Sequence, residues 1–140
     1  MLARFSLDGG DPTAANIDRL LRGFSFRLGS DGQRSDIFTQ SAPVHFARTL
    51  DQMLAFLAAR MPGPDGKSDR EKIEACSAGH PETRHQADYI AAHPLPASFA
   101  GTTYWGVHAF PATNSNGETR FVKFKVIPVG GEEGRQPADE

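Results

Sequence analysis

Four stretches of the chain have the apolar and polar pattern of β-strands. The first runs from Leu2 to Leu7, the second from Gly23 to Leu28, where Phe24, Phe26 and Leu28 alternate with polar residues, and the third from Ser35 to Thr39. The longest runs from Thr102 to Val129 and is interrupted by Asn114-Ser115-Asn116-Gly117. Asn-Gly is a strong hairpin signal because both residues tolerate a positive φ, so this stretch predicts a β-hairpin.

In the middle of the chain the spacing of apolar residues changes to that of helices. Thr49 is a favourable N-cap, and apolar residues recur at helical spacing from Met53 to Met61. A polar helix is expected near residues 70–78, and Pro81 opens another that runs through Ala92. These helices form an insert of about residues 49–93 between strands.

The order of strands, helices and strands predicts an α+β fold with a mainly antiparallel sheet. In the hairpin, Trp105 lies on one face of its strand and Tyr104 and Phe110 on the other. Both faces are therefore expected to be covered, as in the wall of a β-barrel. We expect one domain over residues 1–129 and a disordered acidic tail over residues 130–140, which are polar and rich in Gly and Glu.

Length and charge narrow the class of function. The 140 residues suffice for one core, and a formal net charge of −2 does not favour nucleic acid or an anionic membrane as a partner. No run approaches the roughly 18 apolar residues of a membrane span. The first residues lack a basic region followed by an apolar core, so a cytoplasmic location is the default. A periplasmic location would follow if an N-terminal segment were missing.

Several motifs, in order along the chain, resemble the haem catalases and more closely the short catalase-related peroxidases. They are Arg4-Phe5-Ser6, Arg22-Gly23-Phe24, the run from Asp36 to Phe46, the helix that begins after Thr49, and Tyr104 to Phe110 in the hairpin. The match extends from about Arg4 to Val129. The resemblance implies an incomplete catalase-like β-barrel, a haem cofactor, and activity on hydrogen peroxide in oxidative-stress defence. In a peroxidase, an organic electron donor would be a further partner.

The resemblance assigns roles to five residues. Ser6 falls on a Ser that hydrogen-bonds the distal His of the family, and Gln40 falls on an Asn that assists this His. Arg4 falls on an Arg that pairs with a haem propionate, since a guanidinium can bind a carboxylate through two parallel hydrogen bonds. Phe38 and Phe46 fall near positions that line the haem pocket or its channel.

The resemblance finds no match for the two residues that the family uses directly at the iron. The distal His lies upstream of the Arg-Phe-Ser motif in the family, and the proximal Tyr lies downstream of the hairpin. We interpret Tyr104 as a barrel-wall aromatic and His45 as a rim or core His. We therefore expect a fragment of a longer enzyme that alone binds haem weakly and turns over little peroxide. The alternative is a degenerate, non-enzymatic domain derived from the barrel, without haem.

Two further expectations concern metals and partners. Cys76, His80, His85 and His93 lie close in sequence, but their spacing misses the common zinc patterns, so we expect a solvated helical face and no metal site. An incomplete barrel exposes unpaired strand edges and apolar surface. Self-association through these open edges is therefore expected.

Overall fold

The chain contains two compact units. The computed structural model describes residues 1–8, 13–15, 17–30 and 32–134. One unit consists of Met1–Pro43 together with the segment that begins at Ile90, and the other is Val44–Tyr89. In the first unit, the N–H of Ala97 donates to the carbonyl of Glu133 at 2.9 Å, so backbone hydrogen bonding extends to residue 133 of the expected tail. Residues 135–140 of that tail lie outside the described residues.

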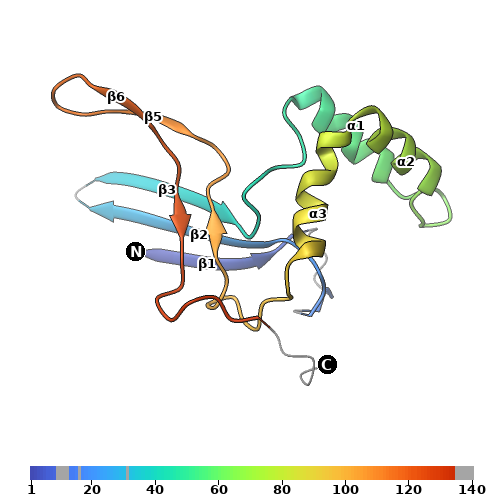
Figure 1. Ribbon diagram of the computed structural model, residues 1–140, viewed down its shortest axis with the longest axis horizontal. Coiled ribbons are helices and arrows are strands. Elements are labelled where there is room, and N and C mark those ends of the chain that lie inside the picture. The colour runs from blue at the N-terminus through green and yellow to red at the C-terminus, as the bar shows by residue number, and fades with distance from the viewer. Residues whose placement is uncertain (9–12, 16, 31, 135–140) are drawn as a thin grey trace. The chain divides into compact units, whose positions relative to one another are not determined.

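The first unit is built on a five-stranded sheet in which every neighbouring pair is antiparallel, in the order β1-β2-β3-β4-β7. Figure 1 shows β1, β2 and β3 side by side in this sheet. The strands are β1 (Leu2–Leu7), β2 (Arg22–Ser30), β3 (Gln33–Gln40), β4 (Tyr104–Trp105) and β7 (Lys125–Val126). The three strands predicted near the N-terminus are confirmed. The β2–β3 ladder is longer than the apolar pattern indicated, because pairing continues to Ser30 opposite Gln33, beyond the last alternating residues.

The predicted hairpin is present, but it is divided between two sheets. Its outer part forms a separate two-stranded sheet of β5 (Phe110–Thr113) and β6 (Thr119–Val122). Between the pairs Trp105–Lys125 and Phe110–Val122, four residues (106–109) face two (123 and 124). Such an insertion disrupts a ladder locally and bends the strand. The bulge therefore separates β5 and β6 from the main sheet.

The hairpin turn differs in detail from a two-residue Asn-Gly turn. The N–H of Gly117 donates to the carbonyl of Asn114 at 3.1 Å, so Ser115 and Asn116 occupy the central positions of the turn. Gly117 follows with φ 80, in the left-handed region that glycine adopts without steric cost. This is the three-residue hairpin loop in which a β-turn is followed by a left-handed residue.

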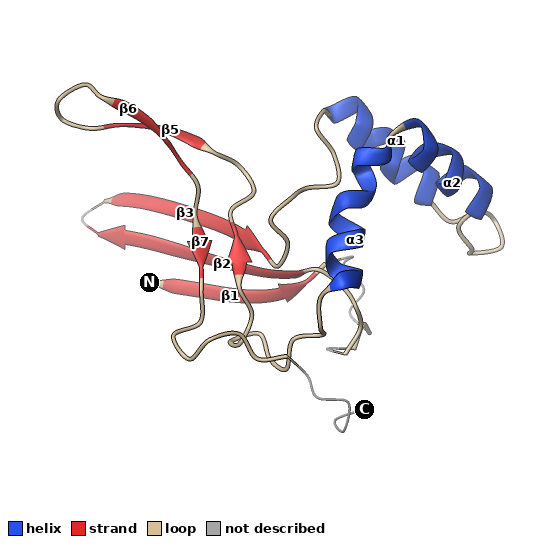
Figure 2. Cartoon of the chain, in the orientation of Figure 1, coloured by secondary structure: helices blue, strands red, loops and turns tan. Residues whose placement is uncertain are grey.

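The second unit is helical, as the apolar spacing predicted (Figure 2). The helices are α1 (Leu50–Arg60), α2 (Arg70–Gly79) and α3 (His85–Ala92), with the 3₁₀ turn η1 (Pro81–Arg84) before α3, which continues three residues beyond the unit. The Thr49 side chain accepts a hydrogen bond from the N–H of Gln52 at 3.2 Å, which confirms the predicted N-cap of α1. Among the described residues, no helix has the length and apolar character needed to cross a membrane.

These elements confirm an α+β fold with antiparallel sheets. The strands in the described part of the chain form one five-stranded and one two-stranded sheet, and they do not close into a barrel. The incomplete barrel therefore stays a prediction.

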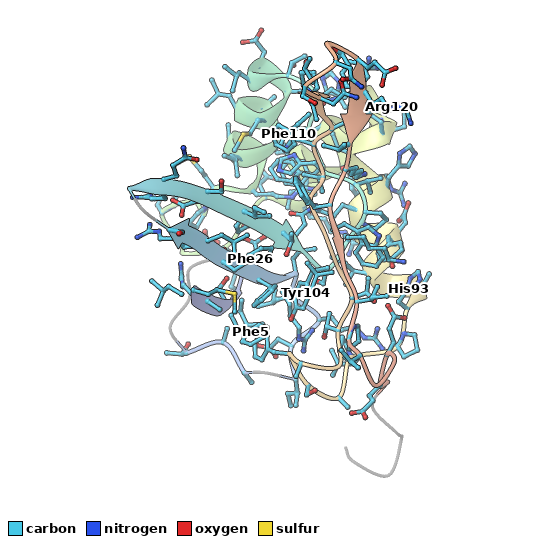
Figure 3. All side chains as sticks on the ribbon, turned by 90° about the vertical axis from the view of Figure 1, so that its left-hand side faces the viewer. Phe5, Phe26, His93, Tyr104, Phe110 and Arg120 are labelled. Atoms are coloured by element: carbon cyan, nitrogen blue, oxygen red, sulfur yellow. The ribbon has the colours of Figure 1, made fainter. Side chains whose placement is uncertain are left out.

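Aromatic rings cover one face of the five-stranded sheet, which we call the aromatic face and define by Phe5, Phe24, Phe26 and Tyr104 (Figure 3). Ring centroids lie 4.8 Å apart for Phe5 and Phe24, and 5.6 Å apart for Phe24 and Tyr104. Tyr104 is 2% exposed and donates its hydroxyl proton to the carbonyl of Phe99 at 2.8 Å. Burial raises the pKa of this phenol, so Tyr104 is a neutral core residue.

Candidate functional site

The strand register brings four of the five residues assigned by the resemblance onto one face of the sheet. Ser6 and Gln40 are both paired with the same residue of β2, and Arg4 and Phe38 are both paired with another residue of that strand. Directly paired residues project from the same face of a sheet. Arg4, Ser6, Phe38 and Gln40 therefore share one face, which we call the site face. It is opposite to the aromatic face, because its residues alternate with Phe5 and Phe24 along the strands.

The four side chains of the site face differ in exposure. Arg4 is exposed, Ser6 is half-buried, and the Phe38 ring is 63% exposed. Gln40, at the end of β3, is 4% exposed. The outer part of the face thus presents a cation and an aromatic ring, whereas the amide lies within the protein.

An open hollow of about 310 Å³ lies on this part of the sheet. Six of its lining residues belong to the site face by register, and three belong to the opposite face: Leu2, Arg4, Ser25, Arg27, Asp36 and Phe38 on the first, and Ala3, Phe26 and Ile37 on the second. The surface is largely apolar, and the guanidinium groups stand beside it. This combination suits an apolar ligand that carries a carboxylate, since arginine binds carboxylates through paired hydrogen bonds.

Asp36 joins two arginines beside the hollow. Its carboxylate accepts hydrogen bonds from Arg27, with Nε at 2.8 Å from Oδ1, and from both Nε and Nη2 of Arg34. The hydrogen bonds from these guanidinium groups lower the pKa of Asp36 to about 2. The carboxylate is therefore ionised at neutral pH, and it fixes the side chain of Arg27 along the sheet.

Trp105 also belongs to the site face, because it is paired directly with Gln40 across β3 and β4. The ammonium of Lys125 lies 5.4 Å from the centroid of its ring. The alternation of residues along its strand predicts Trp105 in a barrel wall and does not connect it with the site. No local sequence pattern indicates this pairing, because it joins a residue before the helical insert to a residue after it. Arg27 was also missed, although alternation from Ser25 along β2 would have placed it on this face.

Phe46, the fifth assigned residue, belongs to the second unit. Its ring stacks on His45 and on Phe56, with centroid separations of 4.3 Å in both cases. The guanidinium carbon of Arg60 lies 3.4 Å from the centroid of Phe56 on α1. These contacts hold Phe46 within the helical unit, separately from the four residues that the register brings together.

No group of three or more His, Cys, Asp or Glu side chains could hold a metal ion in the ranges that the structure describes. Cys76 lies on α2, whereas His80 lies beyond the end of that helix, 3.9 Å from the Glu82 carboxylate through Nδ1.

Comparisons with known proteins agree on one family. A family model described as Catalase matches residues 1–138. The chain is 32% identical to a catalase-related peroxidase from Synechococcus elongatus over 140 residues, which cover 94% of this chain and 40% of that protein. It is 30% identical to Catalase B from Emericella nidulans over 134 residues, covering 89% of this chain and 18% of that protein.

Solved structures show the same fold. A structure of a bacterial catalase superposes with a TM-score of 0.81 at 22% identity and covers 97% of this chain and 27% of that chain. Catalase A from Saccharomyces cerevisiae gives a TM-score of 0.81 at 21% identity, covering 95% of this chain and 28% of that chain. The chain thus spans 40% or less of the length of these proteins.

Proposed function

Since the chain belongs to the catalase family, we propose that its site face is one wall of a haem pocket in which hydrogen peroxide is broken down or used. The observation that carries this proposal is the register of β1, β2 and β3. It gathers Arg4, Ser6, Phe38 and Gln40 on one face, and Arg4 and Phe38 line an apolar hollow there.

Each residue has a role that its chemistry supports. The Arg4 guanidinium would hold a haem propionate at the edge of the hollow, and the Phe38 ring would lie against the macrocycle. The Ser6 hydroxyl and the Gln40 amide would orient the group that moves protons on the peroxide side. The haem itself would supply the redox chemistry. Phe46 lies in the helical unit and forms no part of the site face, so its role stays an expectation from the resemblance.

We assign neither a distal His nor a proximal Tyr to any residue of this sequence. The matched relative is longer than the chain, since the alignment covers 40% of it. We propose that both residues come from segments outside these 140 residues, so that this chain alone binds hemin weakly and turns over little peroxide. In the same view the five-stranded sheet is part of an incomplete barrel, whose open edges lead the chain to self-associate.

Trp105 provides an internal probe for the proposed site, because it is the single tryptophan and it lies on the site face. We expect hemin to quench its fluorescence saturably but with low affinity. Arg4→Ala should weaken this binding by about threefold to tenfold, the loss of one partly solvated charge-assisted contact. Arg70→Ala is the matched control, because Arg70 is an exposed cation on α2 of the helical unit.

Three outcomes would contradict the proposal. Equal affinities of wild type and Arg4→Ala for hemin would show that Arg4 does not contact it. If hemin does not quench the Trp105 fluorescence saturably, the alternative of a degenerate domain without haem is favoured. A sharp Soret shift with rapid oxygen evolution would show that the chain is a working enzyme without further segments.

A further inference from the structure

Gly23 lies on the site face between Ser6 and Gln40, and it is paired directly with both. A Cβ atom added to Gly23 would lie 2.7 Å from the Oγ of Ser6, a separation at which one of the two groups must move. On its other side this Cβ would meet the Phe38 ring at 3.7 Å and the carbonyl of Thr39 at 3.8 Å, which are ordinary contacts. The steric conflict is therefore with the Ser6 hydroxyl alone.

The backbone gives no other reason for a glycine at this position. Gly32, Gly66, Gly117 and Gly131 have a positive φ, and Gly23 is not among them. A glycine inside a strand weakens the strand, and it often marks a place where another group approaches closely. Here the group that approaches is the hydroxyl of Ser6.

We propose that Gly23 is a positioning residue: because it has no side chain, it leaves the space that the Ser6 hydroxyl needs for its observed orientation on the site face. The clash with an added methyl involves the end of a short side chain, which can rotate about χ1 to another staggered well. Gly23→Ala should therefore leave the sheet folded and turn the hydroxyl of Ser6 away from its present direction. The role of this orientation in catalysis rests on the proposed haem pocket. The steric argument for the orientation is independent of that pocket.

Gly29 offers a matched control on the same strand and the same face. A Cβ atom added there would lie 3.2 Å from the backbone carbonyl of Gln33, on the far side of the turn from Ser6. Gly29→Ala therefore adds the same methyl to β2 without touching the hydroxyl. This contact with backbone is itself tight, so Gly29→Ala is a control for the orientation of Ser6, whereas the Ser6→Ala background is the control for stability.

The test combines side-chain NMR with a double-mutant cycle on Gly23→Ala, Ser6→Ala and the double variant. We expect Gly23→Ala to move the χ1 of Ser6 by about 120°, and Gly29→Ala to leave it unchanged. The effect of Gly23→Ala on the equilibrium constant for folding should be about twofold to tenfold less favourable when residue 6 is serine than when it is alanine, where the added methyl should stabilise the strand. The cycle thus separates a clash with the hydroxyl from a general need for glycine.

An unchanged χ1 of Ser6 in Gly23→Ala, or equal effects on stability in both backgrounds, would overturn the positioning role. The Soret band of added hemin gives a separate reading, and we expect Gly23→Ala and Ser6→Ala to shift it in the same direction. Absence of hemin binding by every variant would contradict the proposed function, while χ1 and the cycle would still decide the role of Gly23.

Discussion

At the scale of single residues, Asp36 links the charge of the site face to pH. Its folded-state pKa of about 2 lies below the ordinary 3.8, because the Arg27 and Arg34 guanidinium groups favour the carboxylate. A lowered pKa means that the ionised form stabilises the folded state. This stabilisation is complete above pH 3.8 and is lost as the pH falls through about 2. Since the pair is exposed, salt should screen it.

Replacing Asp36 should reveal this dependence. We expect Asp36→Asn to melt at a lower temperature than wild type at pH 7, because Arg27 and Arg34 then lose their shared partner. The difference in Tm should shrink between pH 3.8 and pH 2, and it should also shrink in high salt. Thermal melts across this range provide the measurement. A difference in Tm that persists unchanged to pH 2 would rule out the titration of Asp36 as its cause.

The candidate residues themselves could be predicted, but their arrangement could not. Arg4, Ser6, Phe38 and Gln40 followed from short motifs that resemble one family. That they share a face depends on the pairing of three strands, which alternation within each strand does not specify. The steric limit at position 23 is also not predictable from the sequence, because it depends on the rotamer of the Ser6 hydroxyl.

At the scale of elements, β1 is an open edge of the main sheet. The strand order begins at β1, which pairs with β2 on one side, and Leu2 is 66% exposed. An exposed edge strand presents unpaired backbone groups that can pair with another chain. On the other side of the sheet, β3 pairs with β4 at Gln40, and β7 is two residues long, so residues 33–39 of β3 form a second open stretch in the described part of the chain. Both stretches offer backbone for self-association, and Leu2 gives access to the one on β1.

Sedimentation at increasing protein concentration tests this role of β1. We expect wild type to form larger species as concentration rises, and Leu2→Lys to shift the equilibrium toward monomer, because an edge lysine opposes strand pairing. Leu54→Lys is the matched control, since Leu54 is 69% exposed but lies on α1. A monomer at every concentration would refute the proposed self-association. If Leu2→Lys and Leu54→Lys shift the equilibrium toward monomer equally, self-association depends on exposed apolar surface in general and not on the β1 edge.

The strands and helices also show where sequence patterns reach their limit. The helices near Thr49 and Pro81 and the N-terminal strands were predicted, because period and capping are local properties. The division of the hairpin between two sheets was not predicted. It arises because four residues of one strand lie opposite two of the other, and this mismatch depends on how the strands pair and not on the sequence of either strand alone. The same bulge leaves Phe110 51% exposed, whereas Tyr104 in the main sheet is buried.

At the scale of the whole molecule, the chain has a small core for its length. Within the described residues, the buried hydrophobic side chains are Leu21, Ala42 and Tyr104. Large apolar side chains such as Phe38, Leu54 and Phe121 are more than 60% exposed. Extensive exposed apolar surface is typical of regions that bind a partner or ligand. This surface agrees with the proposal that further segments and a haem complete the pocket.

The location of bound hemin tests the central claim most directly. Ferric hemin is paramagnetic, so it broadens the NMR signals of the side chains nearest to it, even when binding is weak. Titration of the isotope-labelled chain should broaden the Phe38 ring and Gln40 side-chain amide signals first, followed later by Phe24 and Tyr104 on the aromatic face. Broadening that begins on the aromatic face, or that affects both faces equally, would contradict a haem pocket on the site face.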